Sequence, residues 1–313
     1  MGEVRIRAIH RSSWCAGVTA LVVSLLATSL AVPLVTPLVA QQPAAAATTA
    51  PDALAAAKAA WERHPANVDS IIWYGRRVGY TGAFAEAVAI YSEGLRLHPN
   101  DARLLRHRGH RYISLRDFPS AIADLTRARD LVAGRADEVE PDGQPNARGI
   151  PTSTLHSNIR YHLALAHFVT GDLPIAAALW EEDAKLATNL DQRVASTYWW
   201  VVTAAQMGRH DVVQAALAPV RANWEIIENG SYHRLLLFFR GDLTADAILT
   251  ERATALELQT IGNGIAQWHL AMGRRGAAET MLRRVLASGP SASFGFIAAE
   301  QTAKRIGMGT SVP

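Results

Sequence analysis

The sequence predicts an all-α protein built from repeated helical hairpins. Three observations predict this fold: a period of 34 residues, apolar residues spaced to form one face of a helix, and glycine or proline where a helix must end. The clearest copies of the period are residues 68–101, 102–135 and 259–290. Because one hairpin cannot bury its apolar face alone, we expect the copies to stack on one another as a solenoid.

The N-terminus has the pattern of an export signal. Three arginines lie before residue 12, residues 12–51 carry no charged side chain, and residues 15–31 are mostly apolar. We therefore expect residues 1–40 to be a cleaved signal peptide and the mature protein to be periplasmic or extracellular. The alternative is an uncleaved segment, residues 14–40, that anchors the protein to a membrane.

Charge and cysteine content exclude several classes of function. The net charge is +3, and removing residues 1–40 takes three arginines and one glutamate from 31 basic and 28 acidic residues, which leaves +1. A nucleic-acid partner is therefore not expected. The one cysteine, Cys15, lies in the predicted signal, so the mature chain would have no disulfide, thiolate metal site or cysteine nucleophile.

The helical region is expected to span residues 52–306, after a low-complexity linker at residues 41–51 and before a tail at residues 307–313. An alanine-rich segment that ends before Pro65 matches the second helix of a repeat whose first helix is missing, and would cap the stack. Glycines between paired helices would end the first helix in the left-handed conformation: Gly82, Gly171, Gly208, Gly241 and Gly273. Small residues would let the helices approach closely: Gly75, Ala87, Gly109 and Ala121.

Residues 136–153 interrupt the period with three prolines and a group of acidic residues. We expect them to form an exposed loop inserted between two repeats. A calcium loop is the functional alternative, but the acidic residues lack the spacing and the closing glutamate that such loops use.

The repeat resembles the tetratricopeptide repeat family. Residues 68–101 carry Tyr74-Gly75, Gly82, Ala87, Tyr91 and Pro99 at matching offsets, and the copies at 157–190, 194–225 and 227–253 diverge. The resemblance implies a right-handed α-α superhelix, a solenoid of about five to six hairpins with capping helices, the last at residues 293–306.

The resemblance also implies that the first helix of each hairpin lines a concave groove. The residues at the groove offsets combine aromatic rings with polar groups, as a peptide-binding or sugar-binding surface requires. The candidate groove residues are Trp73, Arg76, Arg103, Arg106, His110, Asn158, Tyr161, Tyr198, Trp199, Tyr232, Asn263 and Gln267.

Two parts of this surface have alternative interpretations. Of the successive rings Tyr198, Trp199 and Trp200, at least one must lie in the core, and the helical angle favours Trp200 for that place. Arg103, Arg106 and His110 share one face and could bind a carboxylate or phosphate, or could simply face water.

No catalytic or metal-binding motif is present in the sequence, and no cofactor is expected. We therefore expect a non-catalytic exported scaffold that binds a peptide or protein segment in its concave groove. A structural subunit that self-associates through the open ends of the solenoid is the main alternative, and an enzyme or a small-ligand or sugar-binding protein is less favoured.

Overall fold

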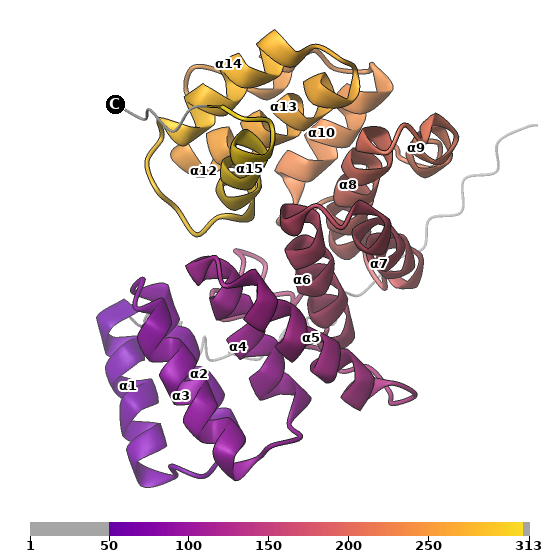
Figure 1. Ribbon diagram of the computed structural model, residues 1–313. Helices are drawn as coiled ribbons and strands as arrows, with labels where there is room; N and C mark the ends of the chain where they lie inside the picture. Colours follow the sequence, from indigo (N-terminus) through magenta and orange to yellow (C-terminus); the bar gives the residue numbers. More distant parts are fainter. Residues whose placement is uncertain (1–49, 309–313) are drawn as a thin grey trace, which may run out of the picture. The chain divides into compact units, whose positions relative to one another are not determined.

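The computed structural model describes residues 50–308 and consists of helices packed as antiparallel neighbours (Figure 1). The predicted signal peptide, Cys15, nearly all of the predicted linker and most of the predicted tail lie outside the described residues. Within residues 50–308, no helix is both long and apolar enough to cross a membrane.

The order of the elements follows the predicted repeat. The helices are α1 (Ala50–Arg63), α2 (Val68–Tyr80), α3 (Phe84–Leu97), α4 (Ala102–Leu115), α5 (Phe118–Val132), α6 (Leu155–Thr170), α7 (Leu173–Leu186), α8 (Leu190–Gln206), α9 (His210–Leu217), α10 (Gly230–Arg240), α11 (Ala245–Ile248), α12 (Ala255–Glu257), the π-helical turn η1 (Leu258–Gly262), α13 (Asn263–Ala271), α14 (Arg275–Leu286) and α15 (Phe294–Arg305). Six successive pairs, from α2–α3 to α13–α14, lie between α1 and α15. The all-α repeat fold is confirmed.

The turns inside the hairpins have the predicted backbone conformation. All five glycines expected there have a positive φ, between 70° and 94°. The α4–α5 hairpin has no glycine at this point, and Arg116 takes the left-handed conformation instead, with φ 65°. Because a side chain rarely adopts this conformation, Arg116 needs compensating contacts.

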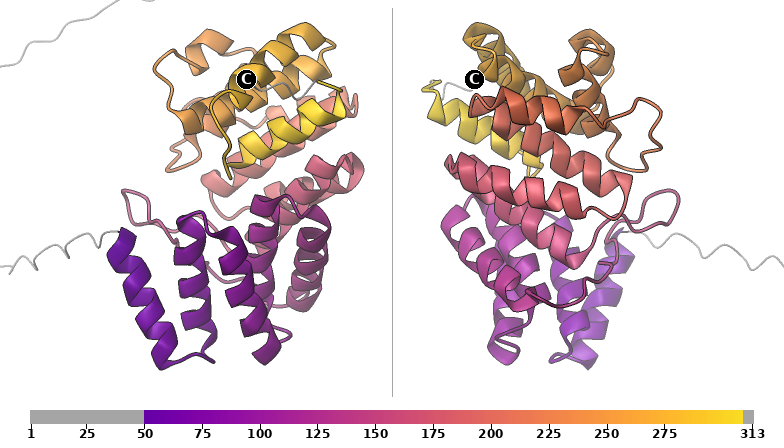
Figure 2. Two further views of the ribbon diagram at one scale, coloured as in Figure 1. Left: turned by 60° about the vertical axis from the view of Figure 1, so that its left-hand side comes forward. Right: turned by 90° about the vertical axis from the view of Figure 1, so that its right-hand side faces the viewer.

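Those contacts join helices that are far apart in sequence. The Arg116 Nε atom donates to Glu300 on α15 at 2.9 Å, and its Nη2 atom donates to the Ser291 carbonyl at 2.8 Å. Helix α15 also packs against α6, and the Arg305 guanidinium donates to the Phe168 carbonyl at 3.3 Å (Figure 2). The last helix therefore closes against the middle of the helical stack as well as capping its own neighbour.

Residues 136–153 form a loop between α5 and α6 that is mostly exposed, as the sequence predicted, but three of its residues are buried. A short antiparallel pairing, in which Leu155 donates to the Glu138 carbonyl at 2.9 Å and Glu140 to the Ser153 carbonyl at 3.1 Å, holds its two ends together. Glu140, Gly143 and Thr152 are buried. Glu140 has polar partners on α4 and α6, Gly143 has one on α2, and Thr152 donates to Glu228 before α10. The periodicity of the sequence could not reveal these partners.

Close helix packing explains the small residues of the repeat. A Cβ atom added at Gly109 would lie 2.7 Å from the Leu125 Cγ atom, and one added at Gly75 would lie 2.5 Å from the Tyr91 ring. Leu125 and Tyr91 are both fully buried, so neither has room to move away.

Gly109→Ala should therefore lose stability relative to Gly276→Ala. Both changes exchange glycine for alanine within a helix, but a Cβ atom at Gly276 meets nothing within 4 Å. We expect the free energy of unfolding of Gly109→Ala to lie about 1–3 kcal/mol below that of Gly276→Ala, because of overpacking. Urea unfolding followed by circular dichroism measures this difference. Equal values for the two variants would contradict close packing of α4 on α5.

Candidate functional site

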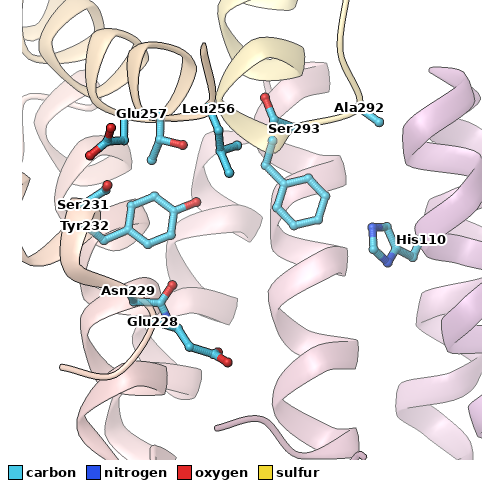
Figure 3. Close-up of a pocket in the computed structure, with 11 residues that line it drawn as sticks. His110, Glu228, Asn229, Ser231, Tyr232, Leu256, Glu257, Ala292 and Ser293 are labelled. Atoms are coloured by element: carbon cyan, nitrogen blue, oxygen red, sulfur yellow. The ribbon is translucent and has the colours of Figure 1, made fainter. Parts of the chain in front are cut away.

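The main candidate site is a cleft bounded by α4, α6, α8, the segment before α10 and the start of α15. Two adjoining cavities, of about 320 and 360 Å³, share His110, Glu228, Asn229, Tyr232 and Phe294 in their walls. Leu256 and Glu257 of α12 border one of them, and the inserted loop borders the other. Figure 3 shows His110 approaching from α4 on the side opposite Tyr232.

Five of the twelve predicted groove residues line this cleft: Arg106, His110, Asn158, Tyr161 and Tyr232. They come from α4, α6 and α10, the first helices of three hairpins. The structure thus brings together residues that are up to 126 positions apart, from Arg106 to Tyr232.

Tyr198 and Trp199 lie in the core instead of lining the cleft. Both rings are 0% exposed, and Trp199 stacks on Trp180 of α7 with ring centroids 5.3 Å apart. Trp200, which the helical angle favoured as the core ring, is only partly buried. The preference between the two tryptophans was wrong because α8 is covered on the side of Trp199 by both α6 and α7.

The remaining predicted residues are also placed away from the open cleft. Asn263 and Gln267 are fully buried, where Gln267 donates to Asn263 and to Thr302 at 2.9 Å each. Arg103, at the N-terminus of α4, forms an ion pair with Asp69 at 2.8 Å. Trp73 packs beneath the Arg76 guanidinium, which lies 4.8 Å from the ring centroid.

A chain of hydroxyl contacts orders the tyrosines at the floor of the cleft. The Trp199 indole N–H donates to the Tyr161 hydroxyl at 2.6 Å, and that hydroxyl donates to the Tyr232 hydroxyl at 3.3 Å. Burial raises the pKa of Tyr161 well above its usual value and also raises the pKa of Tyr232, so both stay protonated. The cleft therefore presents neutral hydroxyls, suited to hydrogen bonding.

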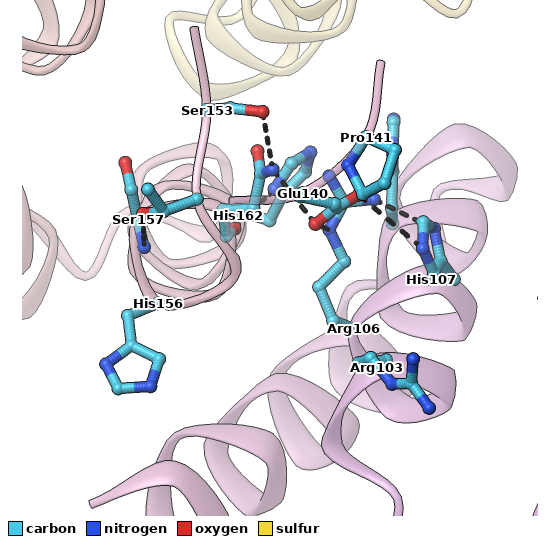
Figure 4. A network of polar contacts seen from close by, with 12 residues as sticks. Arg103, Arg106, His107, Glu140, Pro141, Ser153, His156, Ser157 and His162 are labelled. Atoms are coloured by element: carbon cyan, nitrogen blue, oxygen red, sulfur yellow. Dashed lines mark hydrogen bonds and ion pairs between the residues drawn. The ribbon is translucent and has the colours of Figure 1, made fainter. Parts of the chain in front are cut away.

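Arg106 and Glu140 form a buried ion pair at the edge of the cleft. Arg106 is 7% exposed and Glu140 is 8% exposed. The Arg106 Nε atom lies 3.0 Å from Glu140 Oε2, but its N–H does not point at that oxygen, so Nε has no hydrogen-bond partner. Asn158 donates to the same carboxylate oxygen at 3.0 Å. Figure 4 shows Arg106 and His107 of α4 beside Glu140. The anion site expected on α4 therefore exists in part, and residue 140 of the chain itself occupies it.

His107 completes the surroundings of this carboxylate as a neutral ring. Burial, followed by the nearby positive charge of Arg106, lowers its pKa well below the usual value. The Arg106 Nη1 atom donates to His107 Nδ1 at 3.0 Å, so the ring proton belongs on Nε2, which lies 3.5 Å from Glu140 Oε1. Arg106 thus carries the positive charge that balances Glu140.

Two more arginines hold the backbone of the inserted loop against α2. The Arg76 Nη1 atom donates to the Pro141 carbonyl at 2.7 Å, and the Arg77 Nη1 atom donates to the Gly143 carbonyl at 2.9 Å. A Cβ atom added at Gly143 would overlap the Tyr80 hydroxyl. Glycine is therefore the residue that lets the loop backbone approach α2 this closely.

Glu228 forms a second acidic wall and is fixed by a buried aspartate. Asp191 of α8, 2% exposed, accepts hydrogen bonds from the backbone N–H groups of residues 227, 228 and 229 at 2.8–3.0 Å. Glu228 in turn accepts from Thr152 at 2.6 Å and from Asn146 at 2.7 Å. Burial, together with the charge of Glu228, raises the pKa of the neighbouring Asp142.

Phe294 and Leu256 line the cleft, although the sequence did not indicate them as site residues. Phe294 lies 5.3 Å, between ring centroids, from both His110 and His162, and Leu256 is an exposed side chain at the rim. Both belong to segments that the repeat pattern places far from α4 and α6. Only the packing of α15 on α6 brings Phe294 here, and no local sequence signal reports that packing.

Two histidine rings of the cleft are neutral. Burial lowers the pKa values of His110 and His162 well below the usual value, so both rings are neutral near pH 7. Among residues 50–308, no group of three or more histidine, cysteine, aspartate or glutamate side chains could hold a metal ion.

Comparison with known proteins adds two structures of the same fold class. No protein-family model and no curated protein matches the sequence. YrrB, described as a TPR protein with an unusual peptide-binding site, is 14% identical over 79% of this chain and 100% of its own, with a TM-score of 0.43. A tetratricopeptide repeat protein from Parabacteroides merdae ATCC 43184 is 15% identical over 81% of this chain and 92% of its own, with a TM-score of 0.47. Both belong to the family that the repeat residues of this chain resemble.

Three histidines of the site, the buried His107 and His162 and the partly buried His110, should make the protein less stable in acid. Their pKa values are lowered on folding, so below about pH 6.5 the unfolded chain binds protons that the folded chain does not. The free energy of unfolding should then fall by up to about 1.4 kcal/mol per pH unit for each histidine. Urea unfolding at pH 7.5, 6.5 and 5.5 measures the slope.

His110→Gln is the matched variant for this experiment. This variant should show a weaker dependence of the free energy of unfolding on pH, reduced by the contribution of one histidine, because glutamine does not titrate. An unchanged free energy of unfolding between pH 7.5 and 5.5 in the unsubstituted protein would contradict the burial of these rings in neutral form.

Proposed function

We propose that this tetratricopeptide-like solenoid is an exported, non-catalytic binding module that holds a short segment of a protein partner in the cleft between α4, α6, α10 and α15. The observation that carries this proposal is the convergence of Arg106, His110, Asn158, Tyr161 and Tyr232 on one cleft, although they come from three separate hairpins.

The size of the cleft favours a short segment over a long one. Cavities of about 320 and 360 Å³ lie at the lower end of the range of about 300–1,000 Å³ for small-ligand pockets. The core placement of Tyr198 and Trp199 and the loop over α2 and α4 remove much of the long groove that the repeat alone would present. A segment of a few residues that inserts one or two side chains suits this space.

The chemistry of the walls favours a segment that is partly apolar. Leu256, 61% exposed, and Phe294 supply apolar contact at the rim, while Tyr232 and Asn229 supply hydrogen-bonding groups. Such a mixture of apolar anchors and a few directed polar groups is typical of peptide-recognition surfaces. The predicted signal at residues 1–40 supports the proposed export of the protein.

Leu256→Asp should weaken binding of peptides that the unsubstituted protein selects. A random peptide library, displayed on phage and panned on the immobilised protein, would supply the ligands. We expect affinity for selected peptides to fall at least tenfold in Leu256→Asp, because a carboxylate at the rim removes apolar contact beside Glu257.

Leu186→Asp provides the control, since Leu186 is also an exposed leucine (56%) but does not line the cleft. It should bind the selected peptides as the unsubstituted protein does. Equal binding by both variants would show that selected peptides use another surface, and would contradict the proposed site.

A further inference from the structure

The inserted loop lies on the inner face of α2 and α4 in the way that a bound peptide would. We name residues 138–143 the strap. Besides the hydrogen bond from Asn158 of α6 to Glu140, the strap meets α2 and α4 through one side-chain carboxylate, that of Glu140, and two backbone carbonyls, those of Pro141 and Gly143. All three are recognised by arginines, which are Arg106, Arg76 and Arg77 in that order. Recognition of a carboxylate and of main-chain oxygens depends little on the other side chains of the strap.

The strap does not use this surface to its full capacity. Arg106 is more than nine-tenths buried, yet its Nε–H has no hydrogen-bond partner although the Glu140 carboxylate lies 3.0 Å away. A carboxylate placed with better alignment would gain a hydrogen bond that the strap does not make. Val139 next to Glu140 is 61% exposed, so the strap buries little apolar surface in return.

We propose that the strap is a resident ligand, and that the inner face of α2 and α4 binds an acidic extended segment of a partner once the strap is displaced. The segment that fits carries a glutamate or aspartate followed by backbone carbonyls that reach Arg76 and Arg77. This inference rests on the proposed function and adds to it the chemistry of the partner and a contact that restricts its binding.

The tether explains why the strap would limit binding. Both ends of the loop are held together by the pairing of residues 138–140 with residues 153–155. A ligand tethered by a short linker has an effective concentration of the order of millimolar. A free segment with the same contacts therefore competes poorly until the strap is loosened.

The test uses a fluorescein-labelled peptide with the sequence of residues 136–144, ADEVEPDGQ, and the full-length chain. Glu140→Lys places a positive charge beside Arg106 and should release the strap. Glu138→Lys makes the same change of charge on an exposed side chain of the same loop and serves as the control. Fluorescence anisotropy measures binding, and circular dichroism measures helicity.

We expect Glu140→Lys to bind the peptide at least tenfold more tightly than either the unsubstituted protein or Glu138→Lys. A peptide with glutamine in place of its central glutamate, and the double variant Glu140→Lys with Arg106→Met, should both lose this gain. Equal peptide affinity in Glu140→Lys and Glu138→Lys, with helicity intact, would overturn the proposal.

Gly143→Val provides a second way to release the strap. The valine side chain would clash with the Tyr80 hydroxyl, and Arg106 is left unchanged. It should gain peptide affinity as Glu140→Lys does. Loss of helicity in both strap variants would also overturn the proposal, because a displaceable strap must be able to leave a folded protein. If the strap peptide fails to bind while Leu256→Asp still loses library peptides, only this inference fails and the proposed cleft stands.

Discussion

The buried positive charge of Arg106 is the constraint on which the inner surface of this solenoid depends. A guanidinium removed from water without a partner costs several kcal/mol, so the chain must supply a negative charge at that point. Glu140 supplies it, and the loop that carries Glu140 is thereby held across α2 and α4. Thr152 and Asn146 of the same loop donate hydrogen bonds to Glu228. The loop that pairs with Arg106 therefore also contacts a wall of the cleft.

Local physical chemistry made the hairpins predictable, and long-range packing made the site harder to predict. Gly171 and Gly241 ended helices in the left-handed conformation as expected, and Gly109 meets Leu125 where the repeat requires a small residue. Burial of Trp199 depends on three helices at once, and the approach of Phe294 to His110 depends on α15 packing against α6. Neither follows from any window of the sequence as short as one repeat. The acidic residues near position 140 were visible, but their partners on α4 were not.

These features together favour a binding surface smaller and more selective than an open groove. Core aromatics such as Trp199 stabilise the hairpins and at the same time fix the Tyr161 hydroxyl that faces the cleft. Helix α15 contributes Phe294 to the same space, so the C-terminal end of the solenoid takes part in the site as well as covering the last hairpin. If the cleft binds a partner as proposed, stability and binding share residues here, and an altered ring in the core should disturb both.

A double-mutant cycle on Arg106 and Glu140 tests the central claim most directly. Each single substitution, Arg106→Met or Glu140→Gln, should lower the free energy of unfolding by about 3–5 kcal/mol, because each breaks the buried ion pair. Arg106→Met also leaves the Glu140 carboxylate without its charged partner. The double variant should lose less than the sum of the two, with a coupling energy of about 1–3 kcal/mol in urea unfolding. Additive effects, within about 0.5 kcal/mol, would show that the two charges do not depend on each other, and would contradict this account.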